Sequence, residues 1–217
     1  MILLYDEKWL QEFDGNIDPN TVNFKELANS LEKYTSQYVY KYKTNIKNFN
    51  IIKIKIMNNN IPHLLGLSHN HHVGLPSYYS QAVFEGLKND WTLEKIKKAD
   101  QGWFSKNKDK IIGVLFLYQF MHIQNCKVYT TINSKSKNKR LKRDNIYFII
   151  FKYPNNQSYS IELTPENQNR NSISNTFVPR SLKLNDRIEK DCSEAKFTLI
   201  SRNRIKSKKI SYIPWKT

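Results

Sequence analysis

The periodicity of the apolar residues changes along this chain of 217 residues, and that change limits the folds that the chain can adopt. In the first half, apolar residues recur mainly at helical spacing; Asn23, for example, precedes Phe24 and Leu27 as a helix cap. In the second half, apolar and polar residues alternate as they do in strands. Helices are expected near residues 9–13, 24–34, 77–87, 92–99 and 108–124, and strands at 49–57, 127–133, 146–153, 158–164, 176–178, 195–201 and 209–213. The chain therefore predicts an α+β fold in which N-terminal helices pack on a mainly antiparallel sheet.

One strand interrupts the helical half of the sequence. Three isoleucines alternate with Lys53 and Lys55, so the two lysines point to the same solvated face of that strand. We expect both lysines to contact nucleic acid, and Lys127 and Thr130, on a later strand, are further candidates for such contact. The turn-prone residues 58–62 follow the first strand, and functional side chains are common in loops after strands.

The charge of the chain identifies the kind of partner that it attracts. The sequence contains 35 Lys and Arg but 19 Asp and Glu, which gives a formal net charge of +16 and a pI near 9.7. Such a protein attracts polyanions, and nucleic acid is the polyanion that we expect. A solvated lysine-rich surface is the alternative explanation, because AT-rich coding enriches Asn, Lys and Ile without any binding role.

Several classes of protein are not expected from these residues. Cys126 and Cys192 form neither a CxxC pair nor a disulfide framework, which favours a reducing, cytoplasmic location. The first residues include acids where a signal peptide needs bases. The apolar run at residues 111–123 is shorter than the roughly 20 residues that a bilayer requires, so we expect a buried helix and no membrane contact. No Walker A, GxGxxG or GxSxG motif is present.

Four of the five histidines lie in one short run, from His63 to His72. The pKa of an unperturbed imidazole lies closest to neutrality among the side chains, so histidine can serve as acid or base in catalysis. Metal-free RNA cleavage needs a base for the 2'-hydroxyl, an acid for the leaving 5'-oxygen and a cation for the charge that develops on the phosphate. In a basic protein, the histidine run therefore predicts RNA cleavage.

A zinc site is the alternative interpretation of His69, His71 and His72. Their spacing matches neither a zinc finger nor HExxH, and no cysteine lies nearby in the sequence. We therefore expect no metal and no other cofactor, and we expect these three histidines to assist nucleic-acid binding. The fifth histidine, His122, lies in an apolar segment and is expected to be a satisfied core residue.

Two clusters of basic residues accompany the predicted strands. The first occupies a Ser/Asn-rich loop, and the second covers residues 202–209, before Tyr212 and Trp215. The residues of the first cluster that we expect at phosphates are Lys139, Arg140 and Arg143. Phosphate contacts from the first cluster and base stacking on the aromatics of the second would suit single-stranded RNA. A disordered, solvated loop is the alternative for the first cluster, and a frayed tail for the second.

Two short motifs carry a resemblance to a known family. They are His63-Leu64-Leu65-Gly66-Leu67 and Phe177-Val178-Pro179-Arg180-Ser181. In both, the chain resembles the PBECR4 group of nucleases from phages and mobile elements, which is part of the barnase, EndoU, colicin E5/D and RelE-like assemblage. The resemblance extends from the strand at Phe49 to about Leu184 and implies a metal-independent endoribonuclease.

The resemblance also implies roles for three residues. His63 would be the general acid or base, Ser181 would contact the scissile phosphate, and Arg180 would stabilise the charge of that phosphate. The other histidines of the run have no counterpart in the motif. A structural role is the alternative for His63, because a histidine at the start of an apolar turn can cap that turn.

We expect three segments: an N-terminal helical extension at 1–48, a nuclease-like α+β domain at 49–201 and a basic C-terminal tail at 202–217. The expected function is that of a cytoplasmic endoribonuclease, a toxin or an antiphage or phage-borne effector, that cleaves RNA by 2'-hydroxyl attack. Its expected partners are RNA and an acidic antitoxin or RNA inhibitor. A non-catalytic nucleic-acid-binding regulator and a metal-dependent DNase are the alternatives. Catalysis requires His63 and residues 179–181 to share a positively charged cleft.

Overall fold

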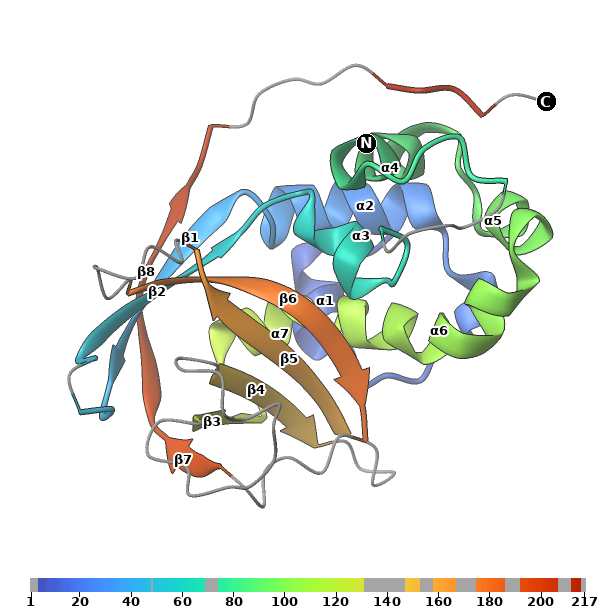
Figure 1. Cartoon of the computed structure of the whole chain (residues 1–217). Coiled ribbons are helices and arrows are strands. Elements are labelled where there is room, and N and C mark those ends of the chain that lie inside the picture. Colours follow the sequence, from blue (N-terminus) through green and yellow to red (C-terminus); the bar gives the residue numbers. More distant parts are fainter. Residues whose placement is uncertain are drawn as a thin grey trace. The chain divides into compact units, whose positions relative to one another are not determined.

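The computed structural model describes residues 4–47, 49–68, 74–130, 147–152, 158–166, 175–185, 192–206 and 212–215. The chain divides into two compact units, each made of discontinuous segments. Unit 1 comprises residues 1–37, 57–118 and 206–217, and unit 2 comprises residues 38–56 and 119–205. Figure 1 shows the helices and strands with the labels used below.

Unit 1 is helical. Its elements are α1 (Glu7–Glu12), the 3-10 turn η1 (Pro19–Thr21), α2 (Phe24–Tyr34), α3 (Asn60–Leu64), α4 (Ser80–Asn89), α5 (Leu93–Ala99) and α6 (Gln101–Leu115). Asn23 caps α2 as predicted, because its Oδ1 accepts a hydrogen bond of 3.1 Å from the Glu26 amide. The buried face of α2 includes Leu27 and Leu31, which the helical spacing of the sequence also indicated.

The apolar segment predicted as one helix over residues 108–124 forms two helices. The first, α6, begins at Gln101, because Asp100 Oδ1 accepts a hydrogen bond of 2.8 Å from the Trp103 amide and caps it. The second, α7 (Leu117–His122), begins in unit 1 and ends in unit 2. Residues 113–121 are all buried, as expected for a core segment. Among the described residues, no helix combines the length and the apolarity needed to span a bilayer.

The C-terminal segment of unit 1 packs on the junction between α4 and α5. The Tyr212 hydroxyl donates a hydrogen bond to the Asp90 carboxylate, which raises the pKa of Tyr212 to about 12. The Trp215 ring meets the Trp91 ring edge-on at 5.5 Å, and Trp91 Nε1 donates to the carbonyl of Ile213 at 3.1 Å. Tyr212 and Ile213 are not part of a strand, so the strand prediction for 209–213 is wrong at these two positions; residues 209–211 lie outside the described residues.

Unit 2 contains one mixed sheet with the strand order β7-β3-β4-β5-β6-β2-β1-β8. The strands are β1 (Tyr38–Thr44), β2 (Ile51–Ile56), β3 (Cys126–Thr130), β4 (Tyr147–Lys152), β5 (Ser158–Pro165), β6 (Thr176–Leu184), β7 (Ser193–Ala195) and β8 (Phe197–Arg204). Neighbouring strands are antiparallel except β2 and β6, which are parallel. The predicted α+β class with a mainly antiparallel sheet is confirmed.

The strand β1 was not expected from the sequence, and it changes the division of the chain. Tyr38, Tyr40 and Tyr42 are buried on one face of β1, and the strand pairs with both β2 and β8. Residues 38–47 therefore belong to the unit of the sheet, whereas α1 and α2 belong to unit 1. The division into functional segments at 1–48, 49–201 and 202–217 stays a prediction; the compact units are discontinuous, because the register of the sheet joins segments that are distant in sequence.

Candidate functional site

The HLLGL motif forms the C-terminal end of α3 and the turn that follows it. The Leu67 amide donates to the Pro62 carbonyl at 2.8 Å, and the Gly66 amide donates to the His63 carbonyl at 3.1 Å. These two bonds, with Gly66 at φ +74°, are those of a Schellman motif. The backbone closes the helix by itself, so the turn does not need the imidazole of His63 as its cap.

The turn is held against α6 within unit 1. Trp103 Nε1 donates to the carbonyl of Leu65 at 3.1 Å, and a Cβ added to Gly66 would lie 2.7 Å from Asn107 Oδ1. Glycine is therefore required at position 66 for two reasons, its positive φ and this close approach. The leucines of the motif are buried, whereas His63 is half-buried. The apolar part of the motif thus fixes the backbone from which the histidine projects.

Ser68 holds the ring of His63. Its Oγ lies 2.5 Å from His63 Nδ1, and both residues are half-buried. A hydrogen bond on Nδ1 restricts the orientation of the ring and leaves Nε2 as the nitrogen for proton transfer, whichever of the two partners donates. Ser68 was not expected as a site residue; the only signal in the sequence is its position directly after the motif.

The second motif forms a β-bulge in β6. Glu162 of β5 pairs with Ser181 and the next residue, Leu163, pairs with Pro179, so Arg180 has no opposite residue. Proline lacks an amide hydrogen and is compatible with a sheet at such an irregularity. Arg180 is exposed, whereas Pro179 is buried and Ser181 is half-buried. The bulge therefore directs the guanidinium of Arg180 toward solvent from the middle of a sheet.

A carboxylate that the sequence analysis missed lies beside this bulge. The Ser181 hydroxyl donates to Glu162 Oε2 at 3.0 Å, and Lys183 Nζ lies 3.9 Å from the same oxygen. Glu162 is only 6% exposed. In residues 158–164 the apolar residues Tyr159, Ile161 and Leu163 alternate with other residues. This alternation indicated that Glu162 lies on the solvated face of the strand. Both faces of β5 are instead buried, and only the three-dimensional structure reveals that.

The remaining nucleic-acid candidates differ in their surroundings. Lys53 is half-buried on β2, Lys55 Nζ lies 2.5 Å from Glu166 Oε1, and Lys127 Nζ lies 3.5 Å from Glu194 Oε2. Thr130 is buried, so its side chain does not present a surface to a ligand. The other predicted contact residues lie outside the described residues; they are His69, His71, His72, Lys139, Arg140 and Arg143.

The two motifs belong to different units of the chain. His63 lies in unit 1, and Arg180 and Ser181 lie in unit 2. A cleft shared by these residues therefore stays a prediction.

The formal charge of the chain is concentrated in unit 2. Unit 2 contains 21 of the 35 Lys and Arg residues and 7 of the 19 Asp and Glu residues. Unit 1 contains the other 14 basic and 12 acidic residues. Unit 2 therefore carries +14 of the net charge of +16. Since Lys and Arg neutralise phosphates, unit 2 is the part of the chain best suited to hold a nucleic-acid backbone.

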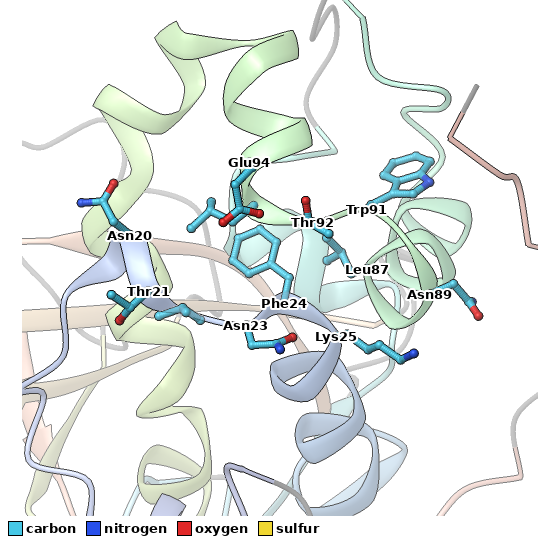
Figure 2. A pocket seen from close by; sticks show the side chains of 12 residues that line it. Asn20, Thr21, Asn23, Phe24, Lys25, Leu87, Asn89, Trp91, Thr92 and Glu94 are labelled. Atoms are coloured by element: carbon cyan, nitrogen blue, oxygen red, sulfur yellow. The ribbon is translucent and has the colours of Figure 1, made fainter. Parts of the chain in front are cut away.

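A pocket of about 330 Å³ lies in unit 1, between η1, the start of α2 and the α4–α5 junction. Figure 2 shows Phe24 at its centre, with polar side chains around it. Several of these polar groups already bond within the chain: Asn23 caps α2, Thr92 caps α5, and Asn20 Oδ1 accepts from Lys97 Nζ at 2.8 Å. The pocket contains none of the predicted site residues, and its polar groups stabilise helix ends.

The described part of the chain contains no group of three or more His, Cys, Asp or Glu residues that could hold a metal ion. The histidine triplet of the run lies outside that part. Of the two cysteines, Cys126 is a poor metal ligand, because burial raises the pKa of its thiol to about 12 and metals bind thiolates.

The chain matches the model of a known family over most of its length. The model of the family described as phage-Barnase-EndoU-ColicinE5/D-RelE like nuclease4 (PBECR4) matches residues 21–214, a range that includes both motifs and segments of both units. No curated protein matches the chain, and no solved structure matches it.

Proposed function

Because this chain belongs to the PBECR4 nuclease family, we propose that it is an endoribonuclease that cuts RNA without a metal ion. Membership of the family already makes nucleic acid the substrate class. The finer assignment to RNA is supported by a group for proton transfer, His63, and by a group that carries a fixed positive charge, Arg180. These are the functions that 2'-hydroxyl attack on the neighbouring phosphate requires.

The observation that carries the proposal is the hydrogen bond between Ser68 Oγ and His63 Nδ1. A histidine on a rigid helix end, held by a hydroxyl at one nitrogen, is oriented before substrate binds. The Schellman turn and its contact with α6 restrict the backbone under it. His63 acts as the general acid or general base in the proposed reaction, and Ser68 is a positioning residue.

In unit 2, Arg180 would stabilise the negative charge of the phosphate as the 2'-oxygen attacks. Ser181 contributes differently from a simple phosphate donor. A carboxylate only accepts hydrogen bonds, so the Ser181 hydroxyl donates its hydrogen bond to Glu162 and presents lone pairs to any further partner. We assign to Ser181 a contact with the 2'-hydroxyl next to the scissile phosphate, a group that DNA lacks.

The biological role that we propose is that of a cytoplasmic toxin or of an antiphage or phage-borne effector. Uncontrolled RNA cleavage would harm the cell that makes the protein, so a neutralising partner belongs to the proposal. An acidic antitoxin or an RNA inhibitor would complement the charge of unit 2.

Cleavage of labelled single-stranded RNA in the presence of EDTA tests the function directly. The expected products end in a 2',3'-cyclic phosphate, and DNA of the same sequence is bound but not cut. The matched control is His63→Ala purified in parallel, which excludes a contaminating ribonuclease if it retains RNA but does not cut it. Retention without cleavage by the wild-type chain would instead identify a regulator, and cleavage of DNA that depends on a divalent ion would identify a metal-dependent DNase.

A further inference from the structure

Two lysines lie directly opposite each other on the β1–β2 hairpin of unit 2. The antiparallel register pairs Lys41 of β1 with Lys53 of β2, and both side chains lie on the less buried face of the hairpin. Residues 38–56 contain five lysines and no Asp or Glu. In Figure 1 these two strands and β8 form one end of the sheet. The hairpin thus combines a high density of positive charge with a defined geometry.

Like charges directly opposite each other destabilise a sheet. The neighbouring Lys55 does not meet this cost, because the residue opposite it is Val39, and it also forms an ion pair with Glu166 at 2.5 Å. In the part of the chain that the structure describes, neither Lys41 nor Lys53 has an ion-pair partner. The pair is therefore unfavourable for the fold alone, and an anion on this face would compensate it.

Hydroxyl groups extend the pair on both sides. The register places Ser201 of β8 next to Lys41 and Thr176 of β6 next to Lys53. Paired residues of neighbouring strands share a face, so the four side chains form one row across β8, β1, β2 and β6. All four residues are half-buried, which limits the number of conformations they can adopt. We call Ser201, Lys41, Lys53 and Thr176 the cross-strand row.

We propose that the cross-strand row binds the phosphate backbone of the RNA substrate; none of its four residues is among those assigned to catalysis. Ammonium and hydroxyl groups are the side-chain donors that proteins commonly place at phosphates. The row contains no aromatic residue, so it would hold the backbone and not read bases. This inference rests on the proposed function for the identity of the polyanion, and it adds Lys41, which the sequence analysis had not selected.

The repulsion between Lys41 and Lys53 predicts opposite changes in stability and in affinity for RNA. Lys41→Glu would replace the like-charged pair by an opposite-charged pair, so the thermal midpoint should rise while affinity for RNA falls. A surface lysine without a role in binding would give a change in stability with no loss of affinity. The opposed changes therefore distinguish a binding site from a solvated surface.

The experiment measures binding of a fluorescent 2'-O-methyl single-stranded RNA by anisotropy over a series of salt concentrations. This RNA cannot be cut by 2'-hydroxyl attack, so the result does not depend on catalysis. The double variant Lys41→Gln/Lys53→Gln should weaken binding and reduce the slope of log K against log salt by about 1.4, since each phosphate contact on a single strand contributes about 0.7. Lys88→Gln/Lys95→Gln is the matched control: it also removes two charges, but from lysines of unit 1 that are paired with Glu32 and Asp90, and it should leave the slope nearly unchanged.

An unchanged slope in the double variant, or equal effects in the double variant and in the control, would overturn the proposal. Loss of binding to an acidic polypeptide such as polyglutamate with unchanged RNA binding would also overturn it and would assign the row to a protein partner. The proposed function fails separately: if the wild-type chain binds RNA through the row but never cleaves it, the row stands and the nuclease assignment does not.

Discussion

The two units of the chain differ in charge and in the chemistry that they carry. Unit 1 is helical, is nearly neutral with 14 basic and 12 acidic residues, and contains His63. Unit 2 is the sheet, with 21 basic and 7 acidic residues, and contains Arg180 and the cross-strand row. In the function that we propose, proton transfer belongs to unit 1 and the attraction of phosphate to unit 2. Variants in the two units should therefore separate turnover from affinity.

The largest expected effect is that of His63→Ala in unit 1. Loss of a general acid or base should lower kcat by roughly 10²- to 10⁴-fold. Affinity for uncleavable RNA should stay unchanged, because the charge of unit 2 is intact. Single-turnover kinetics and anisotropy measure the two quantities separately. A variant that loses affinity in proportion to activity would break the division of roles between the units.

Arg180→Ala in unit 2 should have the next largest effect. Removing a group that stabilises charge in the transition state should lower kcat by roughly 10²- to 10³-fold. Arg180→Lys keeps the charge but loses the planar guanidinium, so partial activity is expected. Arg180→Ala should also weaken RNA binding slightly, whereas His63→Ala should not. This difference would support the division of roles between the two units. Equal activity of the alanine variant and the wild-type chain would remove Arg180 from the site.

Gly66→Ala tests the rigid base of His63 within unit 1. The positive φ and the close approach of Asn107 Oδ1 should destabilise the variant by about 1–2 kcal/mol. Urea denaturation measures the free energy of unfolding. Gly102→Ala is the matched control, because Gly102 is exposed in α6 at an ordinary helical φ and should be neutral or slightly stabilised. Equal stabilities of the two variants would show that the turn is not strained by a side chain.

Ser68→Ala should have the smallest effect on catalysis. Loss of one hydrogen bond of about 1.4 kcal/mol corresponds to about a tenfold decrease in kcat. A positioning role also predicts a displaced pH–rate profile, because the hydroxyl contacts a titrating ring, and rescue by Ser68→Thr. A decrease in stability with an unchanged pH profile would instead assign Ser68 to the turn.

Local patterns predicted much of the fold but missed the strand β1, nearly all of the short strand β7 and the short helix α3. The caps and buried faces of α2 and the alternation of β2 appear in the structure as expected. The strand β1 was missed although Tyr38, Tyr40 and Tyr42 alternate with less apolar residues, because their hydroxyls make them ambiguous in a sequence. In the sheet these tyrosines are buried, and Tyr42 Oη donates to the Met121 carbonyl at 2.5 Å.

The residues of the candidate site also divide into those that short sequence motifs reveal and those that only contacts in the folded chain reveal. His63, Arg180 and Ser181 could be named from two short motifs, since each motif is a continuous segment. Ser68 and Glu162 could not, because their importance depends on contacts that the motifs do not reveal: a side-chain hydrogen bond after a turn and a pairing between two strands. Thr130 was selected on a correct strand, but its burial depends on what covers that strand.

The sequence by itself determined most helices, most strands, the α+β class and the net charge, because caps and periodicities act between residues that are close in the chain. Only the tertiary structure decided that Lys41 opposes Lys53, that Arg180 is the bulged residue of β6 and that Glu162 is buried. The reason is physical: strand register is set by pairing over long sequence separations, and a shift of one residue moves every side chain to the other face.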